Sequence, residues 1–110
     1  MNYKGDERRR HIRIPLSARV TVIDGGLTTY MFTKDLSLGG AGLISDAPFE
    51  VGTKMMLEFG IHGVTKLVKA KGLVVRHFWT PKKGFGVKFT RFMPHSRALL
   101  NKALDKMERT

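Results

Sequence analysis

The sequence contains no cysteine, which excludes a disulfide framework and a thiolate metal site. No apolar stretch approaches the roughly 20 residues of a membrane-spanning helix, and the charged N-terminus lacks the apolar core of a secretory signal. Acidic residues are also scarce: nine face twenty Lys and Arg, and none lies between Phe59 and Leu104, a stretch with ten basic residues. We therefore expect a soluble, cytoplasmic, bacterial-type domain without membrane insertion, whose charge attracts nucleotides, nucleic acid or an acidic protein face.

Signatures of catalysis are missing as well. The sequence has no Walker motif, no nucleophile elbow and no neighbouring carboxylates in an apolar setting, and Gly84-Phe85-Gly86 is not a dinucleotide fingerprint. The four histidines, which show no metal-ligand spacing, are His11, His62, His77 and His95. We expect neither an enzyme, nor a metal site, nor a cofactor.

Hydrophobic alternation predicts six short strands in a chain whose 110 residues suit one domain. The first covers residues 16–22 and is followed by a hairpin turn at Asp24-Gly25-Gly26. A long segment, 64–79, has a possible bend at Gly72. The remaining strands are expected over residues 28–34, 41–45, 55–59 and 85–89.

The last segment changes to a helical period. Five apolar residues fall on one face: Leu99, Leu100, Ala103, Leu104 and Met107. Pro94 suits a first turn, so we expect a helix over residues 95–108, with Ser96 as an alternative start. The predicted fold is all-β with this C-terminal helix, a six-stranded antiparallel β-barrel over residues 14–110. Residues 1–13 are expected to form a flexible basic arm.

The arm ends in a basic cluster made of Arg8, Arg9, Arg10 and Arg13. A charge run of this kind is usually a solvated tail. Arg9 and Arg13, however, are four residues apart, which puts both on one side of an extended chain, about 13 Å apart. Their planar guanidinium groups could converge on one ligand and bind phosphate or the O6 and N7 edge of guanine.

A second polar stretch, Asp35-Leu36-Ser37-Leu38-Gly39-Gly40, interrupts the strand pattern. A carboxylate can accept from the N1 and N2 donors of guanine, a hydroxyl can donate to phosphate, and adjacent glycines permit close approach. The stretch can equally be a bulged turn in which Asp35 is a local backbone acceptor.

Together the two stretches resemble the RxxxR and [DN]xSxxG motifs of the PilZ family, bacterial receptors for cyclic di-GMP. The first stands here as Arg9 to Arg13 and the second as Asp35 to Gly40, and the resemblance covers nearly the whole chain. It implies a six-stranded barrel whose arm closes over the nucleotide. Arg9 and Arg13 would hold guanine and phosphate, Asp35 and Ser37 would contact guanine and the backbone, and Gly40 would keep the surface open.

Arg8, just before the first motif, favours two intercalated ligand molecules over one by the same resemblance. The chain looks like a stand-alone adaptor whose changed surface would signal to a protein partner. The full ligand set expected for cyclic di-GMP is Arg8, Arg9, Arg10, Arg13, Asp35, Ser37, Gly39 and Gly40.

Two other functions fit the charge. A small basic barrel could bind single-stranded nucleic acid by stacking bases on its aromatic rings, which are Phe78, Trp79, Phe85 and Phe89. The strand phenylalanines alternate as core residues do, however, and Trp79 is the better candidate for an exposed ring. The third function is a module whose basic face docks an acidic partner without a nucleotide.

Overall fold

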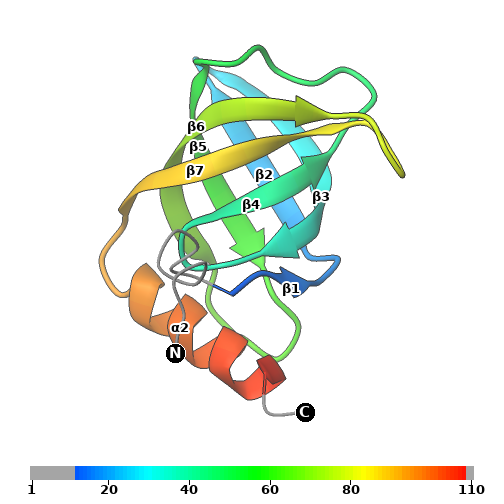
Figure 1. Cartoon of the computed structure of the whole chain (residues 1–110). Helices are drawn as coiled ribbons and strands as arrows, with labels where there is room; N and C mark the ends of the chain where they lie inside the picture. The colour runs from blue at the N-terminus through cyan, green and yellow to red at the C-terminus, as the bar shows by residue number, and fades with distance from the viewer. Residues whose placement is uncertain (1–11, 109–110) are drawn as a thin grey trace, which may run out of the picture.

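The computed structural model describes residues 12–108. These residues form seven strands and one helix, shown in Figure 1. The strands are β1 (Ile14–Pro15), β2 (Arg19–Asp24), β3 (Leu27–Leu36), β4 (Gly40–Ile44), β5 (Lys54–Gly60), β6 (Val68–Phe78) and β7 (Gly84–Phe92). Helix α2 spans Ser96–Glu108. Of the predicted arm, only Ile12 and Arg13 are described, so Arg8, Arg9 and Arg10 lie outside the described residues.

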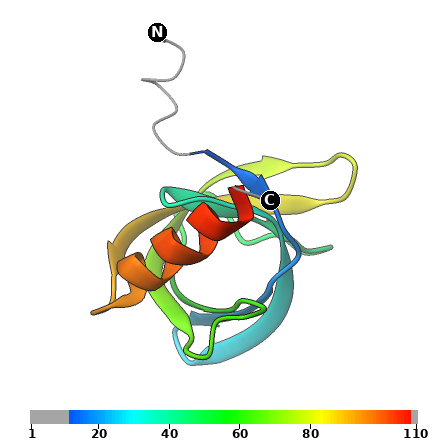
Figure 2. The same cartoon turned by 90° about the horizontal axis from the view of Figure 1, so that it is seen from below.

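The strands close into a barrel. The sheet order is β1-β3-β2-β5-β6-β7-β4, and an additional antiparallel pairing of β3 with β4 completes a ring of six strands. The short strand β1 is extra and pairs with β3 outside this ring. Seen along the barrel in Figure 2, the strands surround a common interior. The predicted fold, a six-stranded antiparallel barrel with a C-terminal helix, is confirmed.

The first hairpin follows the predicted turn chemistry. Asp24 pairs with Leu27, which leaves Gly25 and Gly26 as the two loop residues. Their φ angles are 58° and 100°, in the left-handed region that glycine enters at least cost. Two-residue hairpin loops need this region because their twist must match the twist of the flanking strands.

The predicted long strand over residues 64–79 begins later, at Val68. A turn precedes it, with φ of 85° at Gly63. The irregularity expected at Gly72 is present as a register shift between Lys71 and Gly72. A Cβ at Gly72 would lie 2.4 Å from Val87 Cγ1 and 2.8 Å from Leu57 Cδ1, so the crowded barrel wall requires glycine here.

Alternate residues of the strands fill the barrel. The fully buried large side chains of the interior include Val20, Val22, Leu43, Leu57, Phe59, Val68, Val74 and Phe85. The rings of Phe59 and Phe89 meet edge to face, with centroids 5.6 Å apart. These side chains belong to one continuous hydrophobic core. This core fixes the positions of β3 and β4, the two strands that flank the polar stretch from Asp35 to Gly40.

Helix α2 lies across one end of the ring (Figure 2). It buries Leu100, Ala103 and Leu104, and Leu99 and Met107 pack against the same core, as the helical period predicts. Its first residue is Ser96, the alternative start, because His95 has a φ of 71° and cannot belong to a right-handed helix. Among residues 12–108, no helix has the length and hydropathy to cross a membrane.

Candidate functional site

Strand β1 positions the end of the RxxxR motif. Ile14 pairs with Leu36 and Pro15 pairs with Asp35, so the chain just after Arg13 runs antiparallel to the end of β3. A two-residue strand containing proline has no alternation to reveal it, and the sequence predicts only that the barrel begins at residue 14. This pairing brings together two motifs that are distant in sequence.

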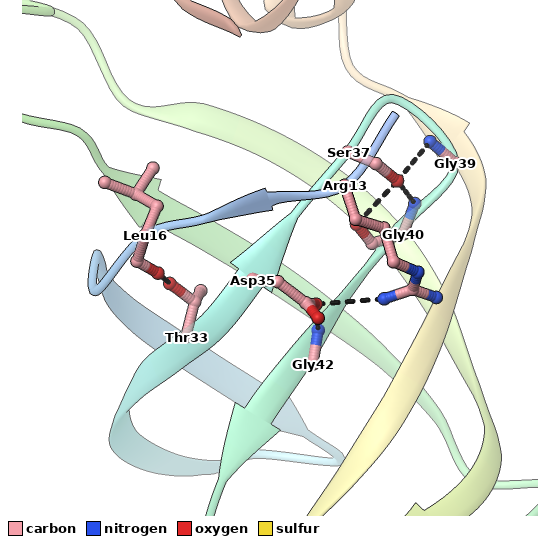
Figure 3. Close-up of polar contacts among 8 residues, drawn as sticks. All are labelled: Arg13, Leu16, Thr33, Asp35, Ser37, Gly39, Gly40 and Gly42. Carbon is pink, nitrogen blue, oxygen red and sulfur yellow. Dashed lines mark hydrogen bonds and ion pairs between the residues drawn. The ribbon is translucent and has the colours of Figure 1, made fainter. Parts of the chain in front are cut away.

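Arg13 and Asp35 form an ion pair. Arg13 Nη1 donates to Asp35 Oδ1 at 2.9 Å, with the two side chains 34% and 16% exposed (Figure 3). The same oxygen accepts from Gly42 N at 3.0 Å, which fixes the carboxylate against β4. The second carboxylate oxygen has no hydrogen bond to any residue in 12–108, and neither do the other nitrogens of the Arg13 guanidinium. Toward residues 12–108, both groups therefore leave donors and acceptors unused.

A bulge turns Asp35 to this position. The β3–β4 register shifts between Thr33 and Asp35, so that Thr33 is buried while Asp35 is partly exposed on the outside. The bulged-turn interpretation of this stretch is thus correct, with Asp35 accepting from the backbone of Gly42. It coexists with the ion pair to Arg13, so the two interpretations of Asp35 do not compete.

Ser37 stabilises the turn between β3 and β4. Its hydroxyl is buried, accepts from Gly39 N and Gly40 N at 3.1 Å each, and donates to Gly40 O at 3.2 Å (Figure 3). The sequence suggested a hydroxyl that donates to phosphate. In the structure that donor is used inside the turn, while contact of Ser37 with a nucleotide stays a prediction.

Gly40 is required by packing. A Cβ there would lie 2.1 Å from Val87 O on the neighbouring strand β7, a distance that backbone atoms cannot tolerate. Gly39 takes part in the same contact, because its carbonyl accepts from Phe89 N at 2.9 Å. The structure therefore shows why position 40 requires glycine: β4 approaches β7 closely there, which the sequence did not predict. The open surface that was expected at Gly40 stays a prediction.

Thr33 anchors the segment that joins β1 to β2. It is 1% exposed, accepts from Ala18 N at 2.8 Å and donates to Leu16 O (Figure 3). These two bonds hold the chain after Pro15 against β3, and so support the register that places Arg13 beside Asp35. This role was not predicted from the sequence. The available signal in the sequence was the polar residue Thr33 between Met31 and Asp35, at a position of the strand that faces inward.

The aromatic residues proposed for stacking divide as predicted. Phe85 and Phe89 belong to the core, and Phe78 is only 9% exposed. Trp79 is 59% exposed beside the β6–β7 turn, with Lys83 Nζ 5.7 Å from its ring centroid. Two rings outside this set, those of Tyr30 and Phe32 on β3, are also exposed, at 72% and 54%. Within residues 12–108, no group of three or more His, Asp and Glu side chains could hold a metal ion.

Comparison with protein families identifies the chain. Residues 7–106 match the model of the PilZ domain, and the chain therefore belongs to the PilZ domain family. The predicted resemblance is confirmed. A search of the curated proteins gives no match to this sequence.

Solved structures share the fold at low sequence identity. The inhibitor of motility MotI/DgrA of Bacillus subtilis has a TM-score of 0.76 at 14% identity, covering 100% of this chain and 54% of that protein. YcgR of Escherichia coli, solved in complex with c-di-GMP, has a TM-score of 0.77 at 20% identity, covering 93% and 46%. PlzA of Borreliella burgdorferi, also in complex with c-di-GMP, has a TM-score of 0.64 at 19% identity, covering 88% and 41%. This chain thus spans about half the length of the first two.

Proposed function

We propose that this chain is a receptor for cyclic di-GMP, in which the arginine arm closes over the nucleotide against the Asp35–Gly40 surface. The observation that carries the proposal is the ion pair between Arg13 and Asp35, which joins the two motifs at one place on the barrel. Membership of the PilZ family supports the ligand class, as do the complexes of YcgR and PlzA with c-di-GMP.

The chemistry of the pair suits a guanine nucleotide. The Asp35 oxygen that has no partner among residues 12–108 can accept from the N1 and N2 donors of guanine, and the Arg13 donors that are unused within those residues can bind two acceptors in a planar fork. Arg9, four residues before Arg13, supplies the second guanidinium of the clamp. Arg8 and Arg10 add positive charge beside a ligand that carries two phosphate charges, or four when two molecules intercalate.

Closing of the arm provides a switch. Fixing the backbone of each arm residue costs about 1–2 kcal/mol, and each charge-assisted hydrogen bond to the ligand contributes about 1.5–3 kcal/mol. A few such contacts offset the ordering of a short arm, so the arm orders only when the nucleotide is bound. The ordered arm and the adjoining barrel face then form the surface that a protein partner recognises.

Calorimetric titration tests the proposal. The chain of residues 1–110 is titrated with cyclic di-GMP, GMP and a short single-stranded oligonucleotide, and we expect heat with cyclic di-GMP, at one or two molecules per chain. Arg9→Ala and Arg13→Ala should each abolish tight binding without lowering the melting temperature by more than a few degrees. Arg19→Ala is the control, because Arg19 is an exposed arginine on β2, a strand that carries none of the proposed ligand-binding residues.

Two outcomes would reject the proposal. Wild-type affinity in either Arg9→Ala or Arg13→Ala would remove the clamp. Heat with the oligonucleotide alone would favour the nucleic-acid function, and that binding should weaken steeply with salt in proportion to the phosphates contacted.

A further inference from the structure

Four residues on adjacent strands form a row across the outside of the barrel. Asp35 on β3 pairs with Gly42 on β4, Gly42 pairs with Gly86 on β7, and Gly86 pairs with Arg76 on β6. Neighbouring strands are about 4.8 Å apart, so about 14 Å of sheet separates the backbones of Asp35 and Arg76. The two middle positions have no side chain.

The side chains at the two ends of the row, Asp35 and Arg76, extend over the neighbouring glycines. A Cβ at Gly42 would lie 3.0 Å from Asp35 Oδ1, so the carboxylate rests against β4. A Cβ at Gly86 would lie 3.2 Å from Cγ, 3.3 Å from Nε and 3.6 Å from Cζ of Arg76, so the guanidinium rests against β7. The acidic group and the arginine therefore approach each other over the two glycines, and a bulkier residue at either glycine would move one of them.

Arg76 is held in place without using its donors. It is exposed, and it has no hydrogen bond or ion pair with any residue in 12–108. Its guanidinium lies over the ring of Phe78, whose centroid is 5.8 Å from Arg76 Cζ. Lys34 Nζ lies 4.6 Å from the same centroid, so two cations share one ring and neither is neutralised there. Such a cluster attracts an anion with several acceptors.

We propose that Arg76 is a further ligand-binding residue, at the opposite side of the site from Arg13 and Asp35. This inference rests on the proposed function, since the ligand is the same nucleotide. The Arg76 fork binds a pair of acceptors, either two phosphate oxygens or the O6 and N7 atoms of guanine. Cyclic di-GMP carries two guanines and two phosphates, so it presents such acceptors at both ends of the row at once.

The sequence contained a signal for this residue. Gly84-Phe85-Gly86 was recognised as a pair of glycines without a nucleotide fingerprint. In the structure a Cβ at Gly84 would lie 2.1 Å from Leu43 O on β4 and 2.5 Å from the Phe78 ring on β6, and a Cβ at Gly86 would meet Arg76 on β6. Only the cross-strand register reveals what the glycines accommodate.

Titration of Arg76→Ala with cyclic di-GMP tests the proposal. A bidentate arginine contact corresponds to a fall in affinity of about 5- to 150-fold, and we expect a fall in that range. Arg19→Ala, at an exposed arginine on β2, which carries no residue of the row, should bind as tightly as the wild type. Melting curves of both variants check the fold, and Arg76→Lys, which keeps the stem over Gly86 but loses the fork, replaces Arg76→Ala if the latter unfolds.

The outcomes are distinct. A fall for cyclic di-GMP with an unchanged melting curve supports the proposal. Unchanged affinity in Arg76→Ala overturns this inference while leaving the receptor function in place. If the wild type binds no cyclic di-GMP, the proposed function itself is wrong.

Discussion

Arg13 Nη1 lies 2.9 Å from Asp35 Oδ1, and this ion pair connects the last residue of one motif with the first residue of the other. The same carboxylate oxygen also accepts a hydrogen bond from Gly42 N. Asp35 therefore links Arg13 to the backbone of β4 as well as to β3. The last residue of the RxxxR motif is thereby held against the barrel by contacts within the protein itself.

The pair should matter more for affinity than for stability. In a double-mutant cycle of Arg13→Ala and Asp35→Ala, urea unfolding should give a coupling of about 0.2–1 kcal/mol, because the pair is partly exposed to solvent. Asp35→Ala alone should destabilise more than Arg13→Ala, because Gly42 N also loses its acceptor. Equal losses in the two single variants would show that the Gly42 bond contributes nothing.

Ser37→Ala should destabilise the fold. Its hydroxyl is the acceptor for Gly39 N and Gly40 N, and leaving such groups unpaired costs about 1–3 kcal/mol in free energy of unfolding. The control is Ser45→Ala, which removes a hydroxyl that accepts from Ala47 N in an exposed turn and should change stability by less than about 0.5 kcal/mol. Normal stability of Ser37→Ala combined with weak nucleotide binding would instead assign the hydroxyl to the ligand.

The strands were predictable because their alternation reports burial directly. Val20 and Val22 on β2, and Leu57 and Phe59 on β5, occupy the inward positions that a period of two assigns to them. The hairpin at Gly25 and Gly26 follows from local backbone chemistry. The helix face could be located for the same reason, although its first residue depended on the positive φ of His95.

The site was predictable only in part, because register and contact across strands are not local properties. The sequence named Arg13 and Asp35, but not the two-residue strand that brings them together. It attributed Gly40 to an open surface, whereas the distance to Val87 O shows a packing requirement. Thr33 and Arg76 were missed, since their partners Leu16 and Gly86 are 17 and 10 positions away along the chain.

Thr33→Val should loosen the segment that carries Arg13. The substitution keeps the shape of the side chain but leaves Ala18 N without its side-chain acceptor and Leu16 O without its donor, at about 1–3 kcal/mol for each group left unpaired. Thr90→Val is the control, because the Thr90 hydroxyl donates to Lys71 O at 3.3 Å on the exposed face of β7. Chemical denaturation measures both variants. Equal stability of Thr33→Val and the wild type would contradict an anchoring role.

Gly40→Ala decides between the two explanations of the last motif residue. If Gly40 is required by packing, the added methyl group collides with Val87 O and the variant loses about 1–3 kcal/mol or more of stability. For a domain of about this size, each kcal/mol lowers the melting temperature by roughly 4–8 °C.

Gly60→Ala is the matched control, because the nearest atom to its added Cβ is Leu67 Cδ2 at 3.9 Å, an ordinary contact. We expect it to melt close to the wild type. The packing explanation also requires Gly40→Ala to lose stability in protein without ligand, whereas a glycine kept only for ligand access would leave the melting curve unchanged and weaken nucleotide binding. A normal melting curve with weak binding would therefore restore the open-surface explanation.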